Sequence, residues 1–94
     1  MLIMRSLADE PLHSGGIAHR LRRNSHGAFR VASAHLIEPL RKLEHRRWVR
    51  SEWRRSENDR RARYYALTGS GRRHMAREMT AWRRRLATFE RLLS

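Results

Sequence analysis

The end of the chain carries an apolar side chain at every third or fourth position. These residues, which we call the seam, are Met75, Met79, Trp82, Leu86, Phe89 and Leu93. This 4-3 alternation is typical of a helix that packs along its length against another helix. Because the stripe is longer than a small domain can cover, it favours a homodimer. The alternative is that the last helix lies along its own domain.

The length and charge of the chain limit the kinds of partner it can have. Its 94 residues suffice for one domain with one modest core. The 22 basic residues outnumber the nine acidic ones and give a net charge of +13, and all but one of the basic residues are arginine. Such a charge attracts polyanions, and the planar arginine fork suits phosphates and base edges. The composition therefore points to a nucleic-acid partner.

Other kinds of site find little support in the sequence. There is no cysteine, which removes disulfides, thiolate zinc sites and cysteine nucleophiles and suits the reducing cytoplasm. The histidines lack metal-ligand spacing, and the scattered carboxylates offer no acid-base pair. We therefore expect no enzyme, metal or cofactor. The apolar start is too short for a signal peptide or membrane span and predicts a short core helix.

Two helices are predicted in the first half of the chain. After Pro11, Ser14 is a candidate N-cap, and a core-facing stripe follows at Ile17, Ala18 and Leu21, with a stop at residues 24–27. The next helix has Ser33 as its candidate cap. Its predicted core-facing residues are Leu36, Ile37, Leu40 and Leu43. Pro39 lies inside this stripe and predicts a kink or a late helix start.

A hairpin and a final helix are predicted in the second half. Residues 48–53 alternate, residues 61–67 are rich in strand formers, and residues 56–59 between them suit a turn. We expect a β-hairpin with an arginine-rich tip, whose aromatic residues hold its base to the core. Thr68 then caps the last helix. The predicted class is mostly α with a small β-hairpin wing, a winged helix-turn-helix plus a C-terminal dimerisation helix.

The chain resembles the PadR-type transcriptional regulators over nearly its full length. The match is closest from LRKLEHRRWVRSEW through SENDRRARYYALTGSGRR. Its most specific part combines Leu40, Leu43 and Glu44 with Trp48. On the second strand and beyond, the residues that resemble the family are Arg61, Tyr64, Tyr65, Leu67, Thr68 and Gly71. The chain starts later than the family usually does, so we expect a shortened first helix.

The resemblance implies a DNA-binding repressor that is dimeric through its C-terminal helices. The third helix would enter the major groove and the wing would touch the backbone or minor groove. The DNA-binding domain would span residues 1–68 and the dimerisation helix residues 69–94. The family's usual Ser-Leu-Tyr-Pro run corresponds here to residues 35–38, so Glu38 would repel the duplex unless it pairs with Arg41 or Lys42.

Two groups of residues are candidates for DNA contact. On the wing they are Arg54, Arg55, Arg60, Arg61 and Arg63, which we expect at phosphates or the minor groove. On the third helix they are Ser33, His35, Arg41 and Lys42, of which the basic side chains suit guanine. The resemblance gives Arg61 a second interpretation, because it lies next to the strand aromatics and its guanidinium could stack there and hold the wing.

The predicted function is a homodimeric, sequence-specific regulator of transcription, a repressor on a pseudo-palindromic site in double-stranded DNA. Some PadR-like regulators bind flat aromatic effectors between the dimer helices, which makes Met79, Trp82 and Phe89 a candidate effector site. One alternative is a basic RNA-binding or ribosome-associated domain, which the charge also suits. Another is an interaction module whose seam binds the helix of a different protein.

Overall fold

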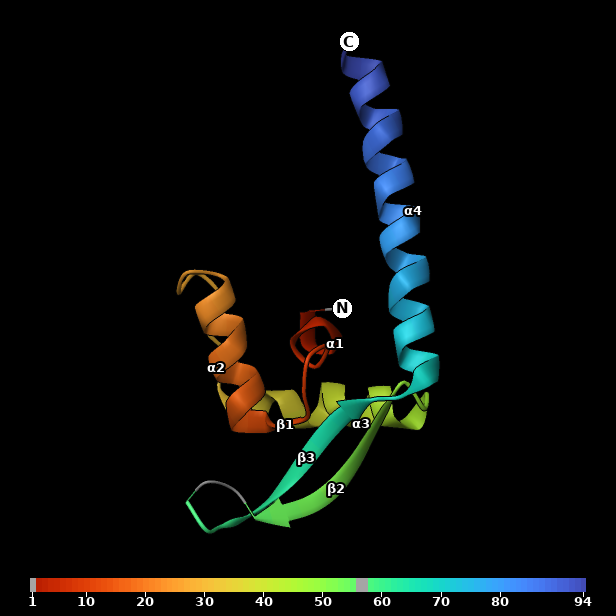
Figure 1. The fold of residues 1–94 in the computed structure, drawn as a ribbon. Coiled ribbons are helices and arrows are strands. Elements are labelled where there is room, and N and C mark those ends of the chain that lie inside the picture. Colours follow the sequence, from red (N-terminus) through yellow and green to blue (C-terminus); the bar gives the residue numbers. More distant parts are fainter. Residues whose placement is uncertain (1, 56–57) are drawn as a thin grey trace.

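The computed structural model describes residues 2–55 and 58–94, and its helices and hairpin follow the predicted order (Figure 1). Short helices come first, followed by a hairpin and one long helix. The elements are α1 (Leu2–Ser6), β1 (Leu12–His13), α2 (Ser14–Asn24), the 3-10 turn η1 (Ser33–Leu36), α3 (Ile37–His45), β2 (Val49–Arg55), β3 (Arg61–Leu67) and α4 (Gly69–Leu93). The predicted class, a winged helix-turn-helix with a hairpin wing and an added C-terminal helix, is confirmed.

One small core joins the helices to the base of the sheet. Its buried apolar residues are Met4, Leu7, Ile17, Leu21, Leu36, Leu40, Val49, Tyr65 and Leu67. Six elements, α1, α2, η1, α3, β2 and β3, each contribute at least one of these residues. Leu12 of β1 and Met75 of α4 pack against the set. Such a core is modest, as expected for a chain of this length.

Helix α2 begins one residue earlier than the sequence analysis predicted. The N-cap is His13, whose Nδ1 accepts a hydrogen bond from the Gly16 amide at 2.9 Å, so the prediction of Ser14 was wrong. Histidine is an uncommon cap, and the β1 pairing of His13 fixes the extended backbone that the position requires. The predicted stop is confirmed, since Gly27 adopts a left-handed φ of 82° beyond the end of the helix.

The third helix starts late, as Pro39 predicted. The chain first makes the turn η1, and Pro39 then falls in the first turn of α3, where its missing amide has no helical partner to lose. Ser33 is not a cap, because Ala32 holds that position and no side chain caps the turn. Ile37 is also not in the core, since the turn rotates it outward to 44% exposure.

The wing belongs to a three-stranded antiparallel sheet in the order β1-β3-β2. Strand β1 was not predicted, and its two residues pair with Tyr64 and Tyr65. Tyr65 is buried and holds the base of the hairpin, but Trp53 lies further along β2 and is 58% exposed, so the expected role of the aromatics fails there. Of the predicted turn, Ser56 and Glu57 lie outside the described residues.

Helix α4 is anchored at one end and projects away from the domain (Figure 1). Thr68 is the N-cap, as predicted, and its Oγ1 accepts a hydrogen bond from the Gly71 amide at 2.9 Å. A Cβ on Gly71 would lie 2.0 Å from the Trp48 carbonyl oxygen, so only glycine permits this close packing. Among the described residues, no helix is long and apolar enough to cross a membrane.

Candidate nucleic-acid interface

The side chains predicted to contact DNA from the third helix all lie on the surface. Ser33 and His35 are exposed on η1, and Arg41 and Lys42 are exposed on α3, while Leu40 beneath them is fully buried. The η1 turn and α3 follow each other directly and form one continuous segment. The segment therefore presents polar and basic groups outward and is held from below by the core.

Glu38 is paired on the surface of α3. Its Oε2 lies 3.7 Å from Nη1 of Arg41, one turn further along the helix. Both side chains are largely exposed, so the pair is weak and easily opened. The pairing partly neutralises the one carboxylate at the start of this helix.

An open hollow of about 390 Å³ separates α3 from the wing. Arg41 and His45 line it from α3, and Arg63 and Tyr65 line it from β3. The hollow is open to solvent, and Glu44 and Ile37 complete its lining. Its position means that α3 and the wing form two edges of one surface.

A hydrogen-bond network that the sequence analysis missed ties the wing to α3. The Glu44 carboxylate accepts hydrogen bonds from Ser51 at 2.8 Å and from Nη2 of Arg63 at 3.1 Å. Nε of Arg63 also donates to Oγ of Ser51 at 2.8 Å. Arg63, a predicted DNA contact, is thus engaged within the protein. The roles of Glu44 and Ser51 in this network could have been predicted only from the register of the strands, which places Ser51 and Arg63 on the same face.

The two faces of the wing carry different arginines. Register pairs Arg55 with Arg61 and Trp53 with Arg63, and alternation along a strand puts all four side chains on the face of Ser51, toward α3. Arg54 lies on the opposite face, where it pairs with Glu52 at 2.8 Å and covers Tyr64.

Individual wing arginines have different surroundings. The guanidinium of Arg61 lies 5.5 Å from the ring centroid of Trp53, as its second interpretation anticipated. Arg55 pairs with Asp59 at 2.8 Å, and both side chains are more than three-quarters exposed. Arg60 is exposed beside the tip. The arginines at the end of the wing are thus available to a large ligand.

The seam divides into two parts. Met75 packs against the core, and Sδ of Met79 lies 3.4 Å from Nη1 of Arg5, so the first turns of α4 do lie along their own domain. Beyond them the remaining seam residues are open. Their exposed fractions are Trp82 56%, Leu86 49%, Phe89 60% and Leu93 73%.

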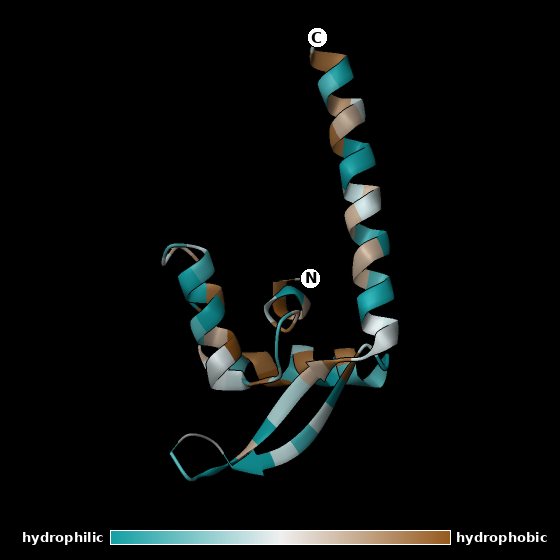
Figure 2. Cartoon of the chain, in the orientation of Figure 1, coloured by the Kyte–Doolittle hydropathy of each residue, from teal (hydrophilic) through white to brown (hydrophobic). Residues whose placement is uncertain are grey.

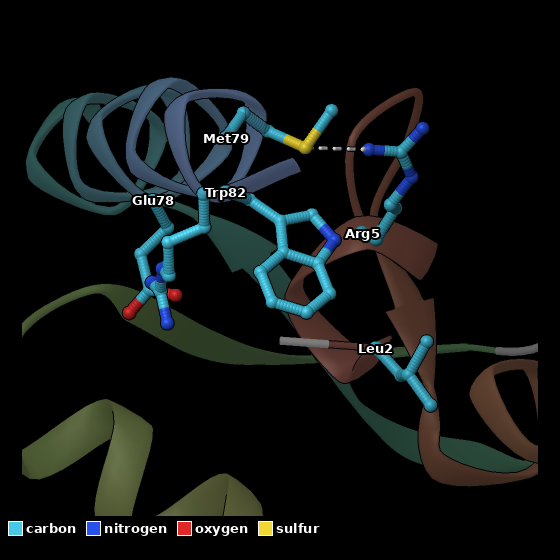
Figure 3. Close-up of a pocket in the computed structure, with 6 residues that line it drawn as sticks. Leu2, Arg5, Glu78, Met79 and Trp82 are labelled. Carbon is cyan, nitrogen blue, oxygen red and sulfur yellow. Dashed lines mark hydrogen bonds between the residues drawn. The ribbon is translucent and has the colours of Figure 1, made fainter. Parts of the chain in front are cut away.

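A pocket of about 290 Å³ lies between α1 and the middle of α4 (Figure 3). Its floor and walls combine apolar and charged groups, from Leu2, Arg5, Glu78, Met79, Trp82 and Arg85. The indole of Trp82 extends from α4 toward α1, between Met79 and Leu2 (Figure 3). Phe89, the third predicted effector residue, is not among the lining residues.

The described part of the chain holds no group of three or more histidine, cysteine or acidic side chains that could bind a metal ion. The histidines are instead dispersed over separate elements. His13 caps α2, and His74 stacks on Trp48 and pairs with Glu78 at 3.2 Å. These contacts give His13 and His74 structural roles.

Solved structures from several bacteria share this fold. A PadR-like transcription factor from Bacteroides fragilis superposes with a TM-score of 0.82 at 24% sequence identity, covering 97% of this chain and 85% of that one. A Streptococcus transcriptional regulator gives a TM-score of 0.83 at 17% identity, with 98% and 88% covered. Bacillus subtilis PadR, solved in complex with operator DNA, gives 0.71 at 15% identity, with 83% and 44% covered.

Sequence comparison gives a more specific result. No curated protein matches the chain. The family model described as the transcriptional regulator PadR-like family, however, matches residues 3–77, a span that includes every element from α2 to β3 and the start of α4. The chain therefore belongs to the PadR-like family of transcriptional regulators.

Proposed function

We propose that the chain regulates transcription by binding double-stranded DNA as a homodimer, and that it acts as a repressor. One observation carries the DNA-binding part. Arg41 and His45 of α3 and Arg63 of the wing border the same open hollow, and register puts Arg55 and Arg61 on the same face of the wing as Arg63. The family membership and the operator complex of Bacillus subtilis PadR support the same function.

The residues divide by role. We assign base contacts in the major groove to Ser33, His35, Arg41 and Lys42, because these side chains are exposed and a helix of this kind can enter that groove. Phosphate contacts fall to Arg55, Arg60 and Arg61 of the wing, with Arg54 reaching the backbone from the other face. Arg63 mainly holds the wing to Glu44. We call the first seven of these residues the reading surface.

The homodimer would form through the exposed part of the seam. Four large apolar side chains in a row on an isolated helix are a surface that water disfavours, and a second copy would cover them. The two reading surfaces would then meet successive major grooves of a pseudo-palindromic site, about one helical turn apart. A dimer bound to a promoter in the cytoplasm would exclude RNA polymerase. We infer from this that the protein represses transcription.

We assign DNA binding to residues 1–68 and dimerisation to the helix of residues 69–94. The start of α4 serves both, since Met75 packs on the core of the first unit. The pocket at Trp82 would suit a flat aromatic effector, which could stack on the indole beside Met79. Because the pocket adjoins the seam, such a molecule would alter how the two helices pair.

An equilibrium titration tests the function. Purified protein is titrated with its own upstream DNA, a scrambled duplex and a hairpin RNA, each at two salt concentrations. We expect salt-resistant preference for the upstream duplex and saturation at two chains per site. The Arg41→Ala/Lys42→Ala variant should lose the preference and keep the scrambled-duplex affinity within a few fold.

The two rival functions give different results in the same titration. Tighter binding to the hairpin RNA by a monomer would replace this function with RNA binding. A chain that is monomeric, binds all three nucleic acids equally and loses them with salt would instead be an interaction module with a basic surface.

A further inference from the structure

Four arginines line the face of α4 that lies opposite the seam. An α-helix turns about 100° per residue, which puts these arginines within about 40° of one another and about half a turn from the seam. We call them the back stripe: Arg73, Arg77, Arg84 and Arg91. Neighbouring positions on this face carry the small residues Thr80, Ala87 and Thr88. Figure 2 shows the resulting alternation of hydrophilic and hydrophobic bands along α4.

The charges of the back stripe are not balanced by other side chains in the described part of the protein. All four side chains are exposed, and none forms an ion pair with a carboxylate of the described residues. The hydroxyls of Thr80 and Thr88 donate to carbonyls of α4 itself, at 3.1 and 3.0 Å. The carboxylates of α4 lie on the flanks of the seam, and that of Glu78 already pairs with His74.

The placement of these arginines works against the helix that carries them. Arg73 lies close to the amino end of α4, where the helix dipole disfavours positive charge, and no acidic residue stands in the first turn. Arg73 and Arg77 are also a like-charge pair at a spacing of four residues, which destabilises a helix. A bound polyanion would relieve both effects.

The back stripe extends far from the reading surface. Helix α4 is anchored where the Thr68 amide bonds to the Trp48 carbonyl at 3.0 Å, and it rises away from α3 and the wing (Figure 1). Measured along the helix, Arg84 lies about 20 Å and Arg91 about 30 Å beyond Gly71. The molecule is 55 Å long, mainly because of this helix. A straight duplex seated on the reading surface therefore does not reach them.

We propose that the back stripe is a second binding surface for duplex DNA. It is about 27 Å long, a length over which each DNA strand presents about eight phosphates. Four arginines at intervals of about 6 and 10 Å can each reach one of them. The guanidinium fork matches phosphate oxygens in geometry as well as in charge. Backbone contacts of this kind require no particular sequence.

A membrane surface fits the same helix less well. A helix that lies in a lipid interface buries its apolar face and keeps its charges at the flanks. On α4 this would bury the seam and point the back stripe away from the lipid, and it would compete with the proposed dimer. Duplex DNA, by contrast, can occupy the back stripe while a second copy covers the seam.

The inference extends the proposed function, since a protein with both surfaces would hold two DNA segments. DNA beyond the operator is tethered to the occupied site, so its effective concentration near the back stripe is high. A bound dimer would then bridge the operator to neighbouring or distant duplex. The back stripe itself does not depend on which sequence the reading surface recognises.

A capture experiment tests the proposal. Upstream duplex is immobilised and loaded with protein, free protein is washed away, and a fluorescent scrambled duplex is added. We expect the wild-type protein to capture the second duplex. The Arg84→Gln/Arg91→Gln variant should load normally but capture at least tenfold less, with the slope of log affinity against log salt smaller by about 1.8. The matched control, Arg22→Gln/Arg23→Gln, removes two exposed charges from α2 and should capture as the wild type does.

Several results would overturn the proposal. The first is wild-type protein that captures no second duplex, and the second is an equal loss of capture in the two variants. The third comes from a parallel binding assay on phosphatidylserine vesicles: a back-stripe variant that loses binding to the vesicles but still captures DNA. If the protein does not load on the upstream duplex at all, the proposed function fails. The same two variants are then titrated directly with the scrambled duplex, and a loss limited to the back-stripe variant would keep this inference, whereas equal affinity would remove it.

Discussion

The imidazole of His74 stacks on the indole of Trp48, with ring centroids 3.6 Å apart and ring planes inclined by 13°. Trp48 stands between α3 and β2, and His74 lies in the second turn of α4. The guanidinium of Arg46 lies 5.1 Å from the Trp48 ring centroid. The contact therefore joins the end of the helix that carries Arg41 to the helix that carries the seam. A shift of α4 at this point would displace Trp48, which lies three residues after the end of α3.

Replacing His74 tests this link. His74→Ala removes the stacked ring, and we expect it to lower the free energy of unfolding by about 1 kcal/mol, within the range for aromatic pairs. Urea unfolding followed by circular dichroism measures the change. His19→Ala is the control, because His19 is exposed on α2. Equal effects of the two substitutions would mean that the stack contributes nothing specific.

Gly71 is the second point at which α4 contacts Trp48, and its substitution gives a stronger prediction. A Cβ there would lie 2.0 Å from the Trp48 carbonyl oxygen, which is backbone and cannot move aside. We expect Gly71→Ala to destabilise the protein by about 3 kcal/mol, at the upper end of overpacking costs. Thermal unfolding is the measurement.

Gly69→Ala supplies the matched control for Gly71. At Gly69 the nearest atom to a Cβ is the flexible guanidinium end of Arg73, at 3.4 Å. The same substitution two residues away is therefore expected to be neutral or slightly stabilising, since alanine favours helix more than glycine does. If both variants unfold at the same temperature, α4 does not pack as closely on Trp48 as described.

The sequence predicted the fold well because its strongest signals are periodic. The 4-3 seam predicts the helix α4, and the strand formers of residues 61–67 predict β3, whose bounds agree with the prediction. Local capping was harder to predict. Ser14 and Ser33 are common cap residues, but strand pairing places His13 in the cap position of α2, and the η1 turn starts after Ala32.

The candidate site was only partly predictable. Exposure of Arg41 and Lys42 follows from the periodicity of Leu36 and Leu40, which are buried. The separate environments of the wing arginines depend on strand register, which brings Arg63 beside Ser51 and leaves Arg54 on the other face. Register is set by pairing in three dimensions, so a one-dimensional charge count could not separate a structural arginine from one available to a ligand.

Arg63 and Arg55 should therefore behave differently when replaced. Arg63→Ala breaks the bonds to Glu44 and Ser51, and we expect a stability loss of about 1 kcal/mol, limited by the partial exposure of the pair. Arg55→Ala should leave stability within about 0.5 kcal/mol and reduce the salt slope of DNA binding by about 0.9. Urea unfolding and fluorescence anisotropy measure the two effects. The reverse pattern would contradict the assigned roles.

The seam predicts the effect of a charge on oligomeric state. Phe89 is 60% exposed on the seam, and Phe89→Asp would place a carboxylate in the proposed dimer interface. We expect a monomer in analytical ultracentrifugation at concentrations where the wild-type protein is dimeric. Thr88→Asp is the control, because its side chain lies on another face of α4 and donates to the Arg84 carbonyl at 3.0 Å. A dimer that survives Phe89→Asp would exclude the seam as its interface.

Glu38 predicts a gain of DNA affinity. Its carboxylate lies 3.7 Å from the guanidinium of Arg41 and would stand close to the phosphates of a duplex on the reading surface. Glu38→Gln removes this repulsion and frees Arg41, and we expect binding to tighten about fivefold, as about 1 kcal/mol of exposed charge interaction implies. Anisotropy titration at low salt measures it. Glu90→Gln makes the same change of net charge near the end of α4, far from the reading surface, and should leave the affinity for a single short duplex nearly unchanged. An equal gain from both variants would show that only net charge matters and that α3 does not face the DNA.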